Sequence, residues 1–275
     1  MFGSVSNNSI EDCFFINNTS TNDGGALYLF LPSDLTITGC YFSSNNALDG
    51  SAIYYEETNL KTLILNSSFF YQNVAWENGA ALFISGSSTV IIENCNFTEN
   101  SIQINEQNIG SVLYLNNPGN LSIISCNFEF NEGIVGTCIY YSETSYKYIT
   151  NKKLLFLIIG DNALLSLTNN YFYNNFAFLG GGAIYFQNKL LAESPYHNNI
   201  FTNNTAFFAN DFFTFPVRLE FTDNNYSSRI NKTTYSINVV PGITMTSLYF
   251  DVVDYYGQTI KSMNGGLLFI FINLI

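Results

Sequence analysis

The chain has 275 residues, of which 21 are acidic and nine are basic, so its formal net charge at neutral pH is −12. Such an acidic chain repels phosphates, which argues against a nucleic-acid partner. The charge is unevenly distributed, because residues 1–211 carry 17 acids and five bases whereas residues 212–275 carry four of each. We therefore expect two domains, 1–211 and 212–275.

A phenylalanine motif of the form x-x-Phe-x-x-Asn recurs along the first domain, beginning with "CFFINN" at 13–18 and "CYFSSN" at 40–45. Seven copies place their phenylalanines in register: Phe15, Phe42, Phe70, Phe97, Phe128, Phe172 and Phe201. Successive members are 27, 28, 27, 31, 44 and 29 residues apart. This near-constant period indicates a repeat architecture.

The segments between the copies alternate like short strands, as in "TLILNS" at 62–67, and no window shows a sustained helical period. A 27-residue unit has a contour of roughly 90 Å, enough for one closed turn of three short strands. Stacking such turns about 4.8 Å apart gives a parallel β-helix. We therefore predict an all-β, right-handed parallel β-helix of about seven coils. A β-sandwich or propeller with an accidental period is the alternative.

A second motif follows each phenylalanine, as in "DGGALYLF" at 23–30, "DGSAIYY" at 49–55 and "LGGGAIYF" at 179–186. We expect its glycines to turn the chain sharply before a strand whose first inward side chain is small. The phenylalanines should point inward and stack on one another. The asparagine three residues later should sit in a corner with left-handed backbone angles, and its amide should bond the next asparagine in a ladder.

The paired motifs resemble the repeat of the polymorphic outer membrane protein family, which are surface adhesins built on pectin-lyase-like β-helices. They are still more similar to the large repeat-rich surface proteins of free-living protists, and "FYNNFAFLGGGAIYF" at 172–186 is nearly a consensus copy. The resemblance covers about residues 10–211 and implies a cell-surface or extracellular adhesion or spacing module. It also implies that "PGITMTSLYFDVVDYYGQTI", at 241–260, forms two strands and a turn of an incomplete β-sandwich-like domain.

Four of the five cysteines, Cys13, Cys40, Cys95 and Cys126, occupy one position of the repeat, two residues before the phenylalanine. They are either stacked thiols or two adjacent-coil disulfides, Cys13–Cys40 and Cys95–Cys126. Cys138 replaces a small residue of the second motif. The chain has no C-x-x-C pair, so zinc is not expected.

We expect no metal or other cofactor. The acids before the glycine corners, Asp23, Asp49 and Glu77, are the residues that would make a calcium ladder, but one carboxylate per coil is a weak form of a calcium site.

We expect no catalytic activity. Polysaccharide lyases and hydrolases on β-helices need a strong base or a tight group of carboxylates. The only arginines, Arg218 and Arg229, lie outside the repeats, and the only histidine, His197, has just Glu193 as an acidic neighbour in sequence. A degenerate carbohydrate-active β-helix that retains glycan binding is the alternative function.

The expected context is a larger membrane-anchored surface protein of which this chain is a fragment. The N-terminus lacks the pattern of a signal peptide, and the apolar runs "KKLLFLII" and "GGLLFIFINLI" are too short to span a bilayer. Four of the nine N-x-S/T sequons are possible N-glycosylation sites, Asn96, Asn120, Asn225 and Asn231. The ligand, a surface protein or a glycan, is unidentified. An uncapped first coil should also self-associate edge to edge.

The longest interval, between Phe128 and Phe172, contains about 17 residues more than a standard coil. We place them in a loop within 142–162, because a solenoid tolerates insertions at its corners. Deletion of residues 144–156 should therefore leave the circular-dichroism β signal and the melting temperature nearly unchanged. Loss of the fold would show this segment to be part of the core.

Overall fold

The computed structural model describes residues 8–30, 32–57, 61–86, 88–103, 110–116, 118–142, 165–186, 198–214, 216–222, 229–230, 249–254 and 256–258. Within these residues all regular structure is β-strand. The chain divides into two compact units, Met1–Thr214 and Phe215–Ile275.

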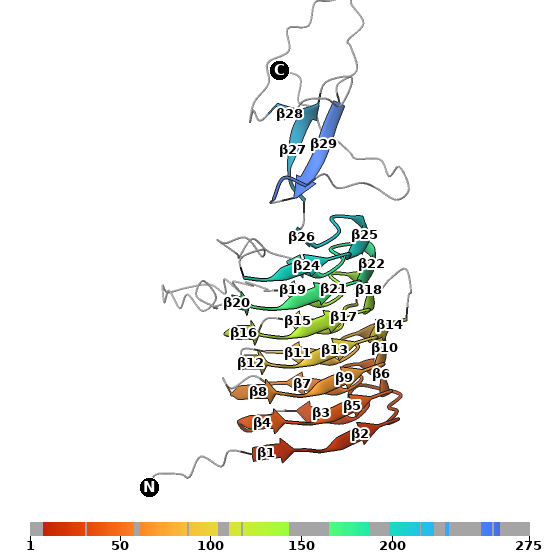
Figure 1. Cartoon of the computed structure of the whole chain (residues 1–275), viewed down its shortest axis with the longest axis vertical. Helices are drawn as coiled ribbons and strands as arrows, with labels where there is room; N and C mark the ends of the chain where they lie inside the picture. Colours follow the sequence, from red (N-terminus) through yellow and green to blue (C-terminus); the bar gives the residue numbers. More distant parts are fainter. Residues whose placement is uncertain are drawn as a thin grey trace, which may run out of the picture. The chain divides into compact units, whose positions relative to one another are not determined.

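The first unit is a parallel β-solenoid whose strands form four sheets, here named A to D (Figure 1). Sheet A contains β1 (Asn8–Glu11), β4 (Leu35–Thr38), β8 (Thr62–Asn66), β12 (Thr89–Glu93), β16 (Leu121–Ile124) and β20 (Leu165–Thr168). Sheet B contains β2 (Phe14–Ile16), β5 (Tyr41–Ser43), β9 (Phe69–Tyr71), β13 (Asn96–Thr98), β17 (Asn127–Glu129), β21 (Tyr171–Tyr173) and β24 (Ile200–Thr202). Sheet C contains β6 (Asn46–Asp49), β10 (Val74–Asn78), β14 (Ser101–Ile102), β18 (Glu132–Val135), β22 (Phe176–Gly180) and β25 (Thr205–Phe208). Sheet D contains β3 (Leu27–Phe30), β7 (Ile53–Glu56), β11 (Leu82–Ser85), β15 (Leu113–Asn116), β19 (Ile139–Ser142), β23 (Ile184–Phe186) and β26 (Phe212–Thr214).

Each coil visits the sheets in the order A, B, C, D and then rises to the next coil, so every strand pairs with its counterpart one coil away. The solenoid completes about six turns, and the predicted parallel β-helix is confirmed. The expected count of three strands per coil was wrong. A typical coil has four strands, one in each sheet.

Two corners of each coil turn at a single residue in the left-handed backbone region. The corner between sheets A and B uses Asp12, Gly39, Ser67, Asn94, Ser125, Asn169 and Asn198, with φ between 49° and 65°. The corner between sheets B and C uses Asn17, Ser44, Gln72, Glu99, Phe130, Asn174 and Asn203. We had expected the motif asparagine itself to have left-handed backbone angles. In the structure, the residue immediately before it has them.

The predicted phenylalanine stack fills the interior beneath sheet B. The seven rings lie parallel, with successive centroids 4.7, 4.9, 4.7, 4.8, 5.0 and 4.8 Å apart. The stack remains in register between Phe128 and Phe172, across the longest sequence interval. The coils on either side of the long interval therefore pair directly, while residues 143–164, which include nearly all of the predicted loop, lie outside the described residues.

The motif asparagines form the predicted ladder next to this stack. Its members are Asn18, Asn45, Asn73, Asn100, Asn131, Asn175 and Asn204. Each Nδ2 group from Asn18 to Asn175 donates to the Oδ1 atom of the next member at 2.9–3.2 Å, and that of Asn204 donates to Oδ1 of Asp211. Asn100 is representative: its Oδ1 atom accepts from the backbone N–H and the Nδ2 group of Asn73, and its own Nδ2 group also donates to the carbonyl of Phe70. The ladder thus satisfies backbone groups that the corner would otherwise bury without partners.

The glycine corner before sheet D behaves as predicted. Gly50 has a φ of 59°, and an added Cβ atom would lie 2.6 Å from the carbonyl oxygen of Ile53. The next inward positions are small and fully buried, as at Ala52, Ala81 and Cys138. In the final copy, Ala209 takes the glycine position with a φ of 54°, and β26 still pairs with β23. The solenoid therefore extends to Thr214, three residues beyond the boundary that we predicted.

The second unit contains one antiparallel sheet in its described part. β27 (Pro216–Thr222) pairs with β28 (Arg229–Ile230) and with β29 (Tyr249–Asp254). The segment 241–260, predicted as two strands and a turn, contributes β29 to this sheet. Residues 241–248 lie outside the described residues.

We predict that Asn100→Ala lowers the free energy of unfolding by on the order of 3–5 kcal/mol, since it orphans the buried N–H of Asn73 and the carbonyl of Phe70. The matched control is Asn96→Ala in the same coil, where the asparagine is on the outer face and water can replace its bonds. We expect the control to cost less than about 1 kcal/mol. Equal losses in urea unfolding of the two variants would contradict the structural role of the ladder.

Candidate interaction surface

The outer face of sheet D carries a second aromatic ladder. The aromatic residue of each glycine motif points outward and stacks on its counterpart; the ladder consists of Tyr28, Tyr54, Phe83, Tyr114, Tyr140, Tyr185 and Phe213. Successive ring centroids are 5.1, 4.9, 5.1, 4.7, 5.2 and 5.2 Å apart. The rings from Tyr28 to Tyr185 lie face against face, whereas Phe213 is tilted by 33° against Tyr185. Tyr28 is exposed, while Tyr140 and Phe213 are buried.

Burial along this ladder also affects its hydroxyl groups. Desolvation raises the pKa of Tyr54, Tyr114, Tyr140 and Tyr185, so these phenols stay neutral. A ring whose two faces are covered by other rings offers little to a flat ligand. The sheet D ladder is therefore best explained as a stabilising element of the fold.

A different arrangement of rings lies on the outer face of sheet B. Phe14, Tyr41 and Phe69 occupy one row on three successive coils, and we name them the ring patch. Their centroids are 6.2 and 6.5 Å apart and their planes are tilted by 51° and 43°. Phe14 is 76% exposed and Phe69 is 47% exposed. Tilted, exposed rings leave parts of their faces open to a partner.

Amide side chains continue the same row beyond the ring patch. Phe69 is followed by Asn96 and then by Asn127, whose Nδ2 group donates to Oδ1 of Asn96 at 3.0 Å. Next to the ring patch, Gln72 donates to the carboxylate of Glu99 at 2.8 Å. Aromatic faces and hydrogen-bonding groups are therefore neighbours on this surface.

Two of the four sequons can be placed. Asn96 lies on the outer side of β13, and Asn120 is exposed immediately before β16. Asn225 and Asn231 lie outside the described residues. Glycosylation of these asparagines remains a prediction.

The acids of the glycine corner form a short stack. Asp49 accepts a 2.8 Å hydrogen bond from the backbone N–H of Asn78. The backbone N–H of Asp49 in turn donates to the carboxylate of Asp23. Desolvation raises the pKa of Asp49 to about 6; hydrogen bonds from Asn78 oppose this shift, and the charges of Asp23 and Glu77 add to it. Desolvation also raises the pKa of Asp23. The third rung is Asn78, not the exposed Glu77 that we had considered.

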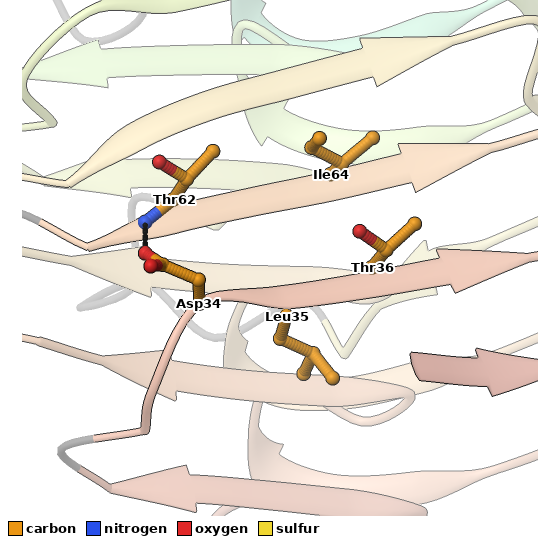
Figure 2. Close-up of a pocket in the computed structure, with 5 residues that line it drawn as sticks. All are labelled: Asp34, Leu35, Thr36, Thr62 and Ile64. Atoms are coloured by element: carbon orange, nitrogen blue, oxygen red, sulfur yellow. Dashed lines mark hydrogen bonds between the residues drawn. The ribbon is translucent and has the colours of Figure 1, made fainter. Parts of the chain in front are cut away.

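A hollow of about 220 Å³ lies on the outer face of sheet A, lined by Asp34, Leu35, Thr36, Thr62 and Ile64 (Figure 2). The Asp34 carboxylate points at the backbone nitrogen of Thr62, with Oδ1 2.8 Å away. Leu35 points to the other side of the strand and is buried. The only acid of this hollow is therefore bound to backbone and faces no second acid or base within it.

Of the residues weighed for catalysis, only the two arginines can be placed. Arg218 lies on β27 and Arg229 on β28, both in the second unit, while Glu193 and His197 lie outside the described residues. Over the described ranges, no three histidine, cysteine, aspartate or glutamate side chains are grouped as metal ligands would be. In the same part of the chain, no helix has the length and apolar character needed to cross a membrane.

Sequence reasoning missed the sheet D ladder and the ring patch. The signal for the first was present, because the motif itself contains an aromatic residue at a fixed place after the glycine. The ring patch had a weaker signal: the residue before each motif phenylalanine is aromatic only in some copies, as at Phe14, Tyr41 and Phe69.

The geometry defines a class of protein, a parallel β-solenoid with regular external rows. A comparison with protein families agrees, since the profile of the right-handed beta helix region matches residues 1–154. The chain belongs to this family.

A curated relative is the metabotropic glutamate receptor-like protein R of Dictyostelium discoideum, which is 26% identical over 201 residues. The match covers 68% of this chain but only 12% of the relative. No solved structure matches the chain.

We predict that Asp49→Asn stabilises the protein at pH 7, because asparagine keeps the acceptor for Asn78 and removes a partly buried charge. The pKa of Asp49 in the fold is above the ordinary value of about 4, so stability is highest below pH 4 and is lost as the pH rises through about 6. After allowance for solvent screening, the gain at pH 7 should be on the order of 1 kcal/mol.

The measurement is thermal unfolding of both proteins between pH 4 and 8. The gain should disappear near pH 4, where the carboxyl is neutral. Glu132→Gln removes one exposed charge and serves as the control, with little effect expected at any pH. A gain that is the same at every pH would contradict the proposed ionisation.

Proposed function

We propose that this chain is a non-catalytic repeat module of a larger cell-surface protein, where it serves in adhesion or as a spacer. The observation that carries the proposal is the arrangement of the described exterior. Its side chains form rows parallel to the solenoid axis, made of rings, amides and hydroxyls. Two of its acids, Asp34 and Asp49, each accept a hydrogen bond from a backbone N–H group.

The same arrangement argues against catalysis. Hydrolysis of a glycosidic bond needs two carboxyl groups that face each other across the substrate, and β-elimination needs a base beside the reacting carbon. Asp23 and Asp49 are neighbouring acids of the described residues, but they are linked within one corner ladder through the backbone N–H of Asp49. We infer that the solenoid provides contact surface and length.

The relative supports a surface setting. It is named as a receptor-like protein, and the match covers 12% of its length. A solenoid of about six turns is a plausible spacer in a protein of that kind, since its coils have one fixed rise each.

For adhesion we assign the contact to the ring patch, and we favour a glycan as the ligand. Sugars present apolar C–H faces and hydroxyl groups together, which suits exposed rings next to amide side chains. Phe14 and Phe69 supply the rings, while Asn96 and Asn127 supply the amides. The alternative of a degenerate carbohydrate-active β-helix would use the same surface and differs in retaining traces of a catalytic centre.

The test uses the full chain on an array of neutral and acidic oligosaccharides, together with assays for release of reducing or unsaturated ends from uronate polymers. We expect binding without bond cleavage. Phe14→Ser combined with Phe69→Ser should lower the binding signal at least tenfold, because the exposed ring faces are lost.

The matched control is Phe176→Ser combined with Phe178→Ser, which removes two exposed rings from the outer face of sheet C. This control should bind like the unmodified protein. Cleavage of any uronate polymer would contradict the non-catalytic proposal, and equal loss in both double variants would contradict the assignment to the ring patch.

Self-association through the first coil stays a prediction. β1, β2 and β3 are the edge strands of sheets A, B and D, and an edge strand exposes a row of N–H and C=O groups. Because the net charge of −12 opposes association, light scattering should show it increase with added salt. A scattering mass that stays monomeric across the salt series would show that this edge is covered.

A further inference from the structure

The corner between sheets A and B contains a second polar ladder, which parallels the asparagine ladder. Its members lie two residues before each stacked phenylalanine and are Cys13, Cys40, Ser68, Cys95, Cys126, Asn170 and Asn199. Each side chain accepts the backbone N–H of the member one coil earlier. Thus Cys40 N–H donates to Ser68 Oγ at 3.1 Å, and Cys126 N–H donates to Asn170 Oδ1 at 2.9 Å.

The order of residue types in this ladder places the cysteines in two separate pairs. Cys13 and Cys40 are neighbours, with the N–H of Cys13 3.4 Å from the sulfur of Cys40. Cys95 and Cys126 are neighbours, with the carbonyl of Cys95 bonded to the N–H of Asn127. Ser68 lies between the two pairs and Asn170 follows the second, so each of the four cysteines has a single cysteine neighbour in the ladder.

We propose that the Cys13–Cys40 and Cys95–Cys126 pairs are sites of disulfide formation that cross-link neighbouring coils, and that Cys138 remains a free thiol. Neighbouring coils hold facing residues about 4.8 Å apart, which lies within the usual Cα separation of a disulfide. All five cysteines are reduced in the structure, so each link requires one thiol to rotate about its Cα–Cβ bond. The inference does not depend on the proposed adhesion function.

The chemistry requires an oxidant, for which we name a low-molecular-weight disulfide such as oxidised glutathione. A cysteine thiolate attacks one of its sulfurs and releases one glutathione thiol, and the second cysteine then displaces the other. The pair thus loses two protons and two electrons, and the oxidant is recovered as two thiols.

Burial limits when the second pair, Cys95 and Cys126, can react. Both side chains are fully buried in the folded coil. Attack on the oxidant must therefore occur while this part of the solenoid is still open, during folding.

Cys138 provides an internal control. It is fully buried in the small-residue position before sheet D, and burial raises the pKa of its thiol well above the ordinary value. Its counterparts on the neighbouring coils are Val112 and Ala183, so no cysteine faces it.

The test refolds the full, reduced chain in a mixture of oxidised and reduced glutathione. Free thiols are then alkylated under denaturing conditions, and peptic peptides are identified by mass spectrometry. We expect four thiols to be lost, only the Cys13–Cys40 and Cys95–Cys126 linked peptides, and an alkylated Cys138. The same digest of chain secreted from eukaryotic cells gives a second measurement if refolding in vitro fails.

Two double variants, Cys13→Ser with Cys40→Ser and Cys95→Ser with Cys126→Ser, should each lose one cross-link and keep the other. Serine is the matched replacement, because Ser68 already occupies the same ladder position in this fold. Five alkylated cysteines in folded protein, or links that join Cys40 to Cys95 or involve Cys138, would overturn the proposal.

Discussion

Every coil of this solenoid must satisfy the polar backbone groups at its buried corners, and the rest of the structure depends on how it does so. Strands share their hydrogen bonds with the coils above and below, but a corner interrupts that pattern and leaves N–H and C=O groups without strand partners. Asparagine solves the problem at the corner between sheets B and C, since one amide can accept and donate at the same time. The corner between sheets A and B uses the same geometry with cysteine, serine and asparagine.

These ladders impose a single rise on the described coils of the solenoid, and the aromatic stacks follow from it. A separation of 4.7–5.0 Å between the phenylalanine rings is the strand spacing seen inside the solenoid. Parallel stacking with little offset is a weaker arrangement for isolated rings than an edge-to-face contact, so the backbone register rather than ring attraction sets this geometry. On sheet B the same register gives tilted rings at Phe14, Tyr41 and Phe69, because those side chains have solvent on one side and can rotate.

The fold was largely predictable because the period is written directly into the sequence. The asparagine of each copy occupies a buried position that requires hydrogen bonding, and the phenylalanine fills a buried apolar position in the ring stack, so both recur and reveal the coil. The number of strands per coil was not predictable in this way. The residue that makes the corner, such as Ser44, Gln72 or Glu99, needs a left-handed backbone but no particular side chain, and so its identity varies.

The candidate surface was harder to predict for a related reason. Outward positions face water and are not held to one residue type, so Phe69 is followed in its row by Asn96 without any loss of register. The sheet D ladder is intermediate between the buried and the outward positions. Its aromatic residue recurs in the glycine motif, but the sequence shows that this residue points outward only once its buried neighbours are known. Buried positions can therefore be recognised because their residues repeat from coil to coil. Residues of a candidate binding surface do not repeat and are harder to recognise.

The central claim is that the buried corner ladder holds neighbouring coils together, and native-state hydrogen exchange tests it most directly. The backbone amides of Asn45, Asn73, Asn100 and Asn131 donate to ladder side chains within the core. They should belong to the slowest-exchanging class of the chain and should exchange only on opening of the solenoid. Exchange of these amides at the rate of exposed positions, while the strand amides beside them stay protected, would contradict the account.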